Sequence, residues 1–153
     1  MLEAGQKAPD FTLPDQDGNE VTLSDLRDGT VVLYFYPRAE TPGCTTQACG
    51  IRDHGADYAA AGARVIGVSP DQPEALRKFA DNQSLDFTLL ADPDHSVAEA
   101  YGAWGEKSMY GKKYMGILRN TYIIDSKGKI AKVLPKVQPK RHDDLVLKAL
   151  AEL

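Results

Sequence analysis

The sequence is poor in cysteine and histidine, with two cysteines and three histidines among 153 residues. Two cysteines do not make the disulfide framework of a small secreted domain, so any disulfide is expected to be transient and catalytic rather than structural. The histidines His54, His95 and His142 are scattered, without the spacing typical of a metal-ligand pair. We therefore expect them to be surface or capping residues, and we expect no metal site.

The sequence also lacks long apolar runs and an excess of charge of one sign. No apolar run approaches the length of a membrane span, and residues 1–7 lack the apolar core of a signal peptide. The net charge is −4, from 18 Lys and Arg against 22 Asp and Glu, which gives no basic footprint for nucleic acid or an anionic membrane. We expect one cytoplasmic domain spanning residues 1–153 that binds neither nucleic acid nor a membrane.

The most informative stretch of the sequence runs from a strand into a helix that carries a cysteine. Thr30–Tyr36 is almost wholly apolar or aromatic, as is typical of a strand buried on both faces. Thr41 and Pro42 are typical of a helix start, as the N-cap and the first helical residue. Cys44 then falls in the first turn, beside unpaired backbone N–H groups and the positive end of the helix dipole. Both features favour the reactive thiolate, so the pattern predicts an activated cysteine rather than an inert buried one.

The second cysteine follows on the same predicted helix. Cys49 lies five positions after Cys44, which places the two Cα atoms roughly 8.6 Å apart on an ideal helix. A disulfide needs less than about 7 Å, so the two cysteines can bond only if the first turns of the helix unwind. This spacing favours a partner that attacks after oxidation, although Cys49 could also be a small core residue. Gly50 is a poor helix former and is expected to make local melting easier.

The rest of the chain alternates between predicted strands and helices. We expect a short N-terminal hairpin at residues 10–23 and two further buried strands at residues 63–69 and 87–90. A strand hairpin is expected at residues 119–134, and a last amphipathic helix at residues 141–153. The helix that begins at Thr41 is expected to continue to about Ala61, and shorter helices are expected to open near Gln72 and Asp92. Residues 102–116 are expected to form a loop.

This order of elements predicts an α/β fold in which helices flank a central mixed β-sheet. Sites in such sheets lie at the carboxyl ends of central strands, where Tyr36 leads into the helix of Cys44. Other chemistries find little support. The two cysteines lack the C-x-x-C spacing of a thioredoxin-type reductase or a zinc site. His54 lies about 15 Å from Cys44 along an ideal helix, too far to serve as its base, and no strand is followed by a phosphate-binding glycine loop.

Several segments outside the cysteine motif carry further specific patterns: Ala8-Pro9-Asp10-Phe11, Phe35-Tyr36-Pro37, Arg52-Asp53, residues 87–92, Trp104-Gly105-Glu106-Lys107 and residues 116–125. Together with Thr41-Pro42-Gly43-Cys44-Thr45, they resemble the peroxiredoxin family over essentially the whole chain, and in particular its bacterioferritin-comigratory-protein or Q-type branch. The resemblance implies a thioredoxin-like fold with an N-terminal β-hairpin extension. It also implies an atypical 2-Cys thiol peroxidase that reduces hydrogen peroxide and organic hydroperoxides and needs no metal or organic cofactor.

By position, the resemblance assigns Cys44 as the peroxidatic cysteine and Cys49 as the resolving one, joined after oxidation by an intramolecular disulfide. Thr41 matches the hydroxyl that holds the peroxide, and Pro42 matches the residue that shields the thiolate. Arg119 matches the distant arginine that completes the pocket. Without the resemblance, Arg119 has a second interpretation, as a surface charge at the start of a strand.

Donors around the sulfur are expected to contribute more than thiolate supply alone. A more acidic thiol gives more thiolate, but that thiolate is less nucleophilic. The larger share is therefore expected from groups aimed at the breaking O–O bond. The candidates are Arg119, Thr41 and the backbone N–H groups of Gly43 and Cys44. Arginine suits this task because it stays charged and offers several donors in one plane.

Two functions stay open at this point. The first is a monomeric thiol peroxidase that is recycled by thioredoxin or a similar thiol reductant. The second is a non-enzymatic, redox-responsive interaction module that the same disulfide switches. Peroxide consumption by catalytic amounts of protein separates the two, because a sensor reacts once and stops.

Overall fold

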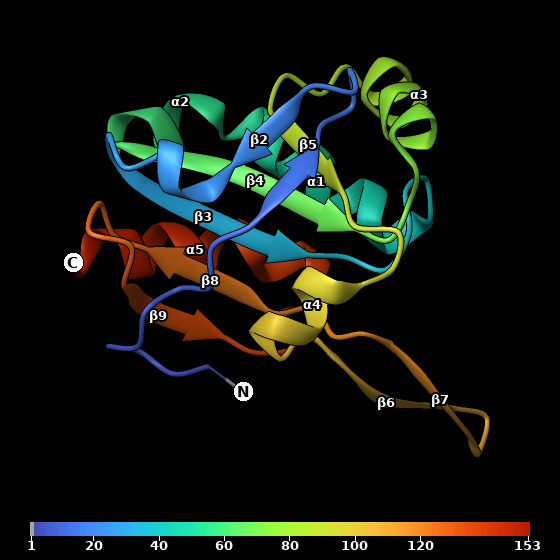
Figure 1. The fold of residues 1–153 in the computed structure, drawn as a ribbon. Coiled ribbons are helices and arrows are strands. Elements are labelled where there is room, and N and C mark those ends of the chain that lie inside the picture. Colours follow the sequence, from blue (N-terminus) through green and yellow to red (C-terminus); the bar gives the residue numbers. More distant parts are fainter. Residues whose placement is uncertain (1) are drawn as a thin grey trace.

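A five-stranded mixed sheet lies at the centre of the computed structural model, which describes residues 2–153 (Figure 1). Its strand order is β5-β4-β3-β8-β9. In that order, the strands are Thr88–Ala91, Ala63–Ser69, Thr30–Phe35, Thr121–Ile124 and Ile130–Leu134. The strands β3, β4 and β5 run parallel, whereas β8 is antiparallel to both β3 and β9. The predicted α/β class with a central mixed sheet is confirmed.

The helices pack on the two faces of this sheet (Figure 1). They are α1 (Pro42–Asp53), α2 (Gly55–Ala60), α3 (Pro73–Gln83), α4 (Ser96–Tyr101) and α5 (His142–Ala151), with short 3-10 turns η1 (Leu23–Asp25) and η2 (Pro139–Arg141). One buried cluster joins the sheet to α1, α2, α3 and α5, and a second joins its other face to α4 and the N-terminal segment. The helix of Cys44 therefore lies in the first of these layers.

Strand β3 divides its side chains between the two clusters. Val32, Tyr34 and Tyr36 point toward α1, while Leu33 and Phe35 point toward α4. Side chains alternate across a strand, so a strand that is apolar throughout supplies both faces of the core. Tyr34 and Tyr36 stack with ring centroids 5.4 Å apart beneath the helix that carries the cysteines.

The predicted N-terminal hairpin is present. Strands β1 (Thr12–Pro14) and β2 (Glu20–Thr22) pair antiparallel across a turn that contains Gly18 at a φ of 81°. Leu13 and Leu23 bury their side chains in the second core cluster, so the extension packs onto the sheet.

The prediction of one continuous helix from Thr41 to about Ala61 is wrong. Helix α1 ends at Asp53, and α2 begins at Gly55 after the C-cap residue His54. The carbonyl of Gly50 accepts hydrogen bonds from both the backbone N–H and the ring Nδ1 of His54, at 3.0 and 2.9 Å. A side chain that bonds its own helix in this way, followed by a glycine, favours a break at this point.

The predicted loop at residues 102–116 is also wrong. Strands β6 (Trp104–Met109) and β7 (Lys112–Ile117) form a separate antiparallel hairpin that projects from the body of the protein (Figure 1). Its two turn residues, Tyr110 and Gly111, have φ values of 51° and 78°, as a tight hairpin turn requires. A tyrosine at the first turn position is not a typical hairpin signal, which is why the sequence did not reveal it.

The histidines were expected to be surface or capping residues; His142 is not at the surface, because it is fully buried, but it is the C-cap residue of η2. It sits at the start of α5 between Thr121 and Tyr34: its Nε2 lies 3.0 Å from the Thr121 hydroxyl, and its ring centroid is 5.4 Å from that of Tyr34. No helix within residues 2–153 is both long and apolar enough to cross a membrane. Within the same residues, no group of three or more His, Cys, Asp or Glu side chains is arranged to hold a metal ion.

Candidate active site

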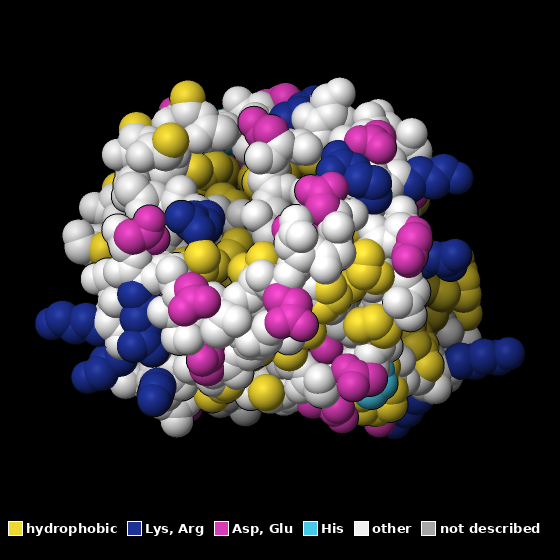
Figure 2. Space-filling view, turned by 45° about the horizontal axis from the view of Figure 1, so that its top comes forward, with side chains coloured by type: hydrophobic (Ala, Val, Ile, Leu, Met, Phe, Trp, Pro, Cys, Tyr) yellow, Lys and Arg dark blue, Asp and Glu magenta, His cyan; other side chains and the backbone are white. Residues whose placement is uncertain are grey.

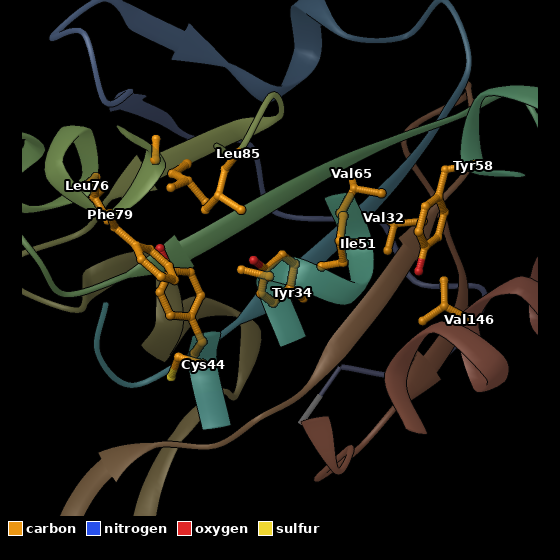
Figure 3. Close-up of a cluster of buried hydrophobic side chains, with 14 of the residues drawn as sticks. Val32, Tyr34, Cys44, Ile51, Tyr58, Val65, Leu76, Phe79, Leu85 and Val146 are labelled. Atoms are coloured by element: carbon orange, nitrogen blue, oxygen red, sulfur yellow. The ribbon is translucent and has the colours of Figure 1, made fainter. Parts of the chain in front are cut away.

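Cys44 lies in the first turn of α1, at the carboxyl end of β3, as predicted. Thr41 is the N-cap residue, with φ and ψ of −76° and 154°, and Pro42 is the first helical residue. The backbone N–H of Thr45 donates to the Thr41 carbonyl at 2.9 Å and so closes the first turn. The side chain of Cys44 is 1% exposed and forms one end of the core cluster in Figure 3. Its sulfur therefore lies beside unpaired N–H groups at the positive end of the helix.

The Thr41 hydroxyl does not cap its own helix. It donates a hydrogen bond of 2.8 Å to the Arg38 carbonyl, and the helix has no side-chain N-cap bond. Because its proton is engaged, the oxygen of Thr41 presents lone pairs that can accept a hydrogen bond from a bound molecule. Pro42 is exposed and, with Gly43, lines a groove of about 380 Å³ that runs to Pro139 and Lys140.

Arg119 binds the sulfur directly. Its Nη2 donates to Cys44 Sγ at 3.1 Å, across 75 positions in the sequence, and its Nη1 donates to Gln47 Oε1 at 2.9 Å. The arginine lies between β7 and β8, and its carbonyl accepts a hydrogen bond of 2.8 Å from the Val137 backbone. Because the planar guanidinium is held by both Cys44 and Gln47, its permanent positive charge lies beside the Cys44 sulfur. The alternative interpretation of Arg119 as a mere surface charge is wrong.

Gln47 is a site residue that the sequence analysis missed. It is 1% exposed and fixes the guanidinium of Arg119 while that group contacts Cys44. Its position three residues after Cys44 was a usable signal, because residues three apart share one face of a helix. A glutamine near a helix start is common enough that this spacing alone did not single it out.

Gly43 makes room for the arginine. A Cβ atom built at Gly43 would lie 3.0 Å from Arg119 Nη2 and 3.4 Å from Pro139 Cγ. The absence of a side chain therefore lets the guanidinium lie close over the first turn of α1. This role comes in addition to the predicted one, in which the backbone N–H of Gly43 binds substrate.

Lys107 adds a second positive charge near the sulfur. Its Nζ donates to the Ile117 carbonyl at 2.8 Å. Burial lowers the pKa of Lys107, the nearby charge of Arg119 lowers it further, and Cys44 acts in the opposite direction. Lys107 and Arg119 line a groove of about 430 Å³ between the β6–β7 hairpin and the segment that contains Pro139. A molecule in this groove meets the positive charges of Lys107 and of Arg119, the residue that contacts Cys44.

Cys49 lies in the same helix but does not contact Cys44. Both cysteines are free; Cys49 is half-buried, and its Sγ lies 3.5 Å from Gln83 Oε1. Because α1 is unbroken from Pro42 to Asp53, the two thiols stand apart in this conformation, as the spacing predicted. The structure therefore represents the reduced form of the protein.

The site consists of a thiol, a fixed guanidinium and a helix N-terminus, and it suits attack by sulfur on a small polar bond. Arg119 and the backbone N–H groups can stabilise negative charge that develops on a leaving group. A further cavity of about 500 Å³ lies elsewhere, between α1, α2 and the first residues of β4 and β5. It is lined by neither cysteine and belongs to a different part of the surface.

Comparisons with known proteins agree with this geometry. Residues 4–133 match the model of the AhpC/TSA family. The chain is 51% identical to peroxiredoxin Bcp of Escherichia coli K12, with 99% of this chain and 97% of the relative covered. It is 52% identical to a putative peroxiredoxin of Mycobacterium tuberculosis H37Rv, covering 92% and 90%. The structure of the Xanthomonas campestris bacterioferritin comigratory protein, studied for alkyl peroxide reduction, superposes with a TM-score of 0.90 at 32% identity, covering 98% of both chains.

Proposed function

This chain belongs to the AhpC/TSA family and is a thiol peroxidase of the Bcp type, and on that premise we propose that Cys44 is its peroxidatic nucleophile and Cys49 its resolving thiol. The observation that carries the proposal is the hydrogen bond of 3.1 Å from Arg119 Nη2 to Cys44 Sγ at the start of α1. The predicted thioredoxin-like fold is confirmed by the same relatives.

In the first step, the thiolate of Cys44 attacks one oxygen of the hydroperoxide. The new S–O bond forms as the O–O bond breaks, the sulfur is oxidised to a sulfenic acid, and the other oxygen leaves as an alkoxide or hydroxide that takes a proton. Arg119 stabilises the negative charge that develops on the leaving oxygen. Thr41 accepts a hydrogen bond from the peroxide O–H, and Pro42 shields the sulfur from bulk water. The first-turn N–H groups, including that of Gly43, orient the substrate.

In the second step, the thiol of Cys49 attacks the sulfur of the Cys44 sulfenic acid. An S–S bond replaces the S–O bond, and the hydroxyl leaves as water with the proton of Cys49. Helix α1 must open for this step, because the two cysteines are held apart while it is intact. An external dithiol then reduces the disulfide and restores the starting state.

Peroxiredoxin relatives imply hydroperoxide substrates and a thiol reductant for this chain. We propose that thioredoxin or a similar small dithiol protein is that reductant, and that residues 1–153 act as one monomeric domain in the cytoplasm. The net charge of −4, and the interspersed acidic and basic side chains on the face shown in Figure 2, support the proposal that the partners include neither nucleic acid nor a membrane.

The test is peroxide consumption by catalytic amounts of protein, supplied with thioredoxin, its reductase and NADPH. The wild type is expected to turn over many times, which also excludes the non-enzymatic redox module. The Cys44→Ser variant is expected to show no turnover, because a serine hydroxyl is scarcely ionised at neutral pH. The Cys49→Ser variant is expected to consume about one equivalent of peroxide and then stall. Sustained turnover by the Cys44→Ser variant would place the nucleophile elsewhere.

A further inference from the structure

One carboxylate of helix α5 meets three positions along the helical stretch that follows Cys49. Gly50, His54 and Tyr58 are spaced four residues apart, and Asp143 faces all three. The Tyr58 hydroxyl donates to Asp143 Oδ1 at 2.5 Å, and His54 Nδ1 lies 3.5 Å from Asp143 Oδ2. The side chain of Asp143 is only 12% exposed, so these partners replace most of its water.

Of the three positions, Gly50 is the one that lies within α1. A Cβ atom at Gly50 would overlap Asp143 Oδ2, so the carboxylate occupies the space that a side chain would otherwise fill. The Gly50 carbonyl also accepts two hydrogen bonds from His54. The turn directly after Cys49 is therefore held by α5 from outside and by His54 from within. Gly50, which helix propensity marks as a weak point of the helix, is therefore the residue against which the Asp143 side chain of α5 packs.

This contact lies at the Cys49 end of the helix and away from the peroxide site. Cys44 is held at the other end by Arg119, which in turn is held by Gln47. Figure 3 shows the same separation, with Cys44 at one end of the buried cluster and Tyr58 at the other. A change at Asp143 should therefore affect the opening of the helix near Cys49 more than the attack of Cys44 on peroxide.

We propose that Asp143 is a positioning residue of the resolving step, whose carboxylate latches the Cys49 end of α1 to α5. While the latch is closed, Cys49 cannot reach Cys44, and the sulfenic acid persists. When it opens, Cys49 attacks and water leaves. The latch thereby sets how long the sulfenic acid is exposed to a second peroxide, which would oxidise it irreversibly. This inference rests on the proposed roles of the two cysteines.

The first test is Asp143→Ala, with Asp144→Ala as the matched control, because Asp144 is the adjacent carboxylate and is exposed. In the reduced protein, amide hydrogen exchange of residues 46–52 should be about tenfold faster in Asp143→Ala and unchanged in the control, the scale expected when a buried charged hydrogen-bond partner is lost. Disulfide formation after a pulse of peroxide should accelerate by the same factor. The second-order rate of the peroxide step should change by less than about twofold.

The second test uses Gly50→Ala in two backgrounds. In the wild type, the new methyl group displaces the Asp143 carboxylate, so disulfide formation should become faster. In the Asp143→Ala background there is no carboxylate to displace, and alanine stabilises a helix relative to glycine by about 1 kcal/mol, so disulfide formation should become roughly fivefold slower. A role of Asp143 in general stability does not predict this reversal of sign. The isosteric Asp143→Asn variant replaces Asp143→Ala in the first test if the alanine variant does not fold, and should act in the same direction with a smaller effect.

The latch and the proposed function fail in different ways. If wild-type protein forms the Cys44–Cys49 disulfide but exchange and disulfide rates are equal in wild type and Asp143→Ala, the latch is refuted and the cysteine roles stand. If Gly50→Ala has the same sign in both backgrounds, the latch is likewise refuted. If the wild type forms no such disulfide, the proposed function fails, while hydrogen exchange of the reduced variants still decides whether Asp143 holds the helix.

Discussion

Replacing Arg119 by methionine should slow the reaction with peroxide without unfolding the protein. Methionine matches much of the length of the arginine stem, and the Val137 backbone bond to position 119 does not depend on the side chain. The substitution removes the donor that lies 3.1 Å from Cys44 Sγ and the donor that lies 2.9 Å from Gln47 Oε1. It therefore deletes a fixed positive charge at the point where the leaving oxygen develops negative charge.

The expected loss is about 10² to 10³ in the second-order rate, the effect of removing one pre-aimed donor from a transition state, or about 2.7–4 kcal/mol. Arg119→Lys should recover only part of this loss. A single ammonium group cannot reproduce the planar fork that contacts Gln47 and Cys44 together. The comparison of methionine with lysine thus separates the contribution of charge from that of geometry.

The assay mixes reduced protein rapidly with hydroperoxide at a series of concentrations. The second-order rate constant is obtained from the change in protein fluorescence or from competition with a second peroxidase of known rate. Arg64→Met is the matched control, since Arg64 is exposed, pairs with Asp28 at 3.3 Å and is not among the residues around Cys44. The control should keep the wild-type rate. Circular dichroism checks that Arg119→Met is folded. If it is, a rate equal to that of the wild type would refute the role given to Arg119.

Gly43→Ala should slow the peroxide step about tenfold, because a Cβ atom there would lie 3.0 Å from Arg119 Nη2 and push the guanidinium away; a wild-type rate would show that the arginine tolerates displacement. Gln47→Leu should have a similar effect on the same rate, since it frees one end of the guanidinium, and an unchanged rate would show that Gln47 is dispensable. Burial, with Arg119 adding to the effect, lowers the pKa of His142 to about 4. In the unfolded chain the pKa of a histidine is about 6.5, so above that pH the side chain is neutral in both states and His142 contributes its full stabilisation of the fold. This contribution to the free energy of unfolding is lost as the pH falls from about 6.5 toward about 4, because the unfolded chain then binds a proton that the folded protein does not. Between pH 7 and 4.5 the wild type should lose about 2–3 kcal/mol more free energy of unfolding than His142→Gln, measured in urea, and parallel losses would contradict this.

The parts of the fold that the sequence could predict depend on local signals. Thr41 and Pro42 mark the start of α1 because capping and a preset φ act within a few residues. The run Ala63–Ser69 is a strand in the structure at the predicted bounds, because β-branched residues between turn signals suit a buried strand. Cys44 could be placed in the first turn for the same reason, as its position follows from the helix start alone.

The parts that the sequence could not predict depend on contacts between distant residues. Gln47 and Gly43 have their roles only because Arg119 reaches α1 from the segment between β7 and β8. Gly50 looks like a weak point by helix propensity, yet the Asp143 side chain, from a helix about ninety positions away in the sequence, fills the space beside it. The burial of His142 could not be predicted from the residues around it, because its partners Thr121 and Tyr34 lie on strands that are distant in the sequence.

Mass spectrometry of the peroxide-treated protein tests the roles of the two cysteines most directly. Trypsin should release residues 39–52 as one peptide, because Arg38 and Arg52 flank a stretch without lysine or arginine that contains both cysteines. Reduced protein is treated with one equivalent of peroxide, its remaining thiols are alkylated at low pH, and the peptide is weighed. We expect this peptide to lose two hydrogens and to take up no alkylating agent, which identifies the Cys44–Cys49 disulfide. An alkylated Cys44, or two such peptides linked between different molecules, would contradict the proposed mechanism.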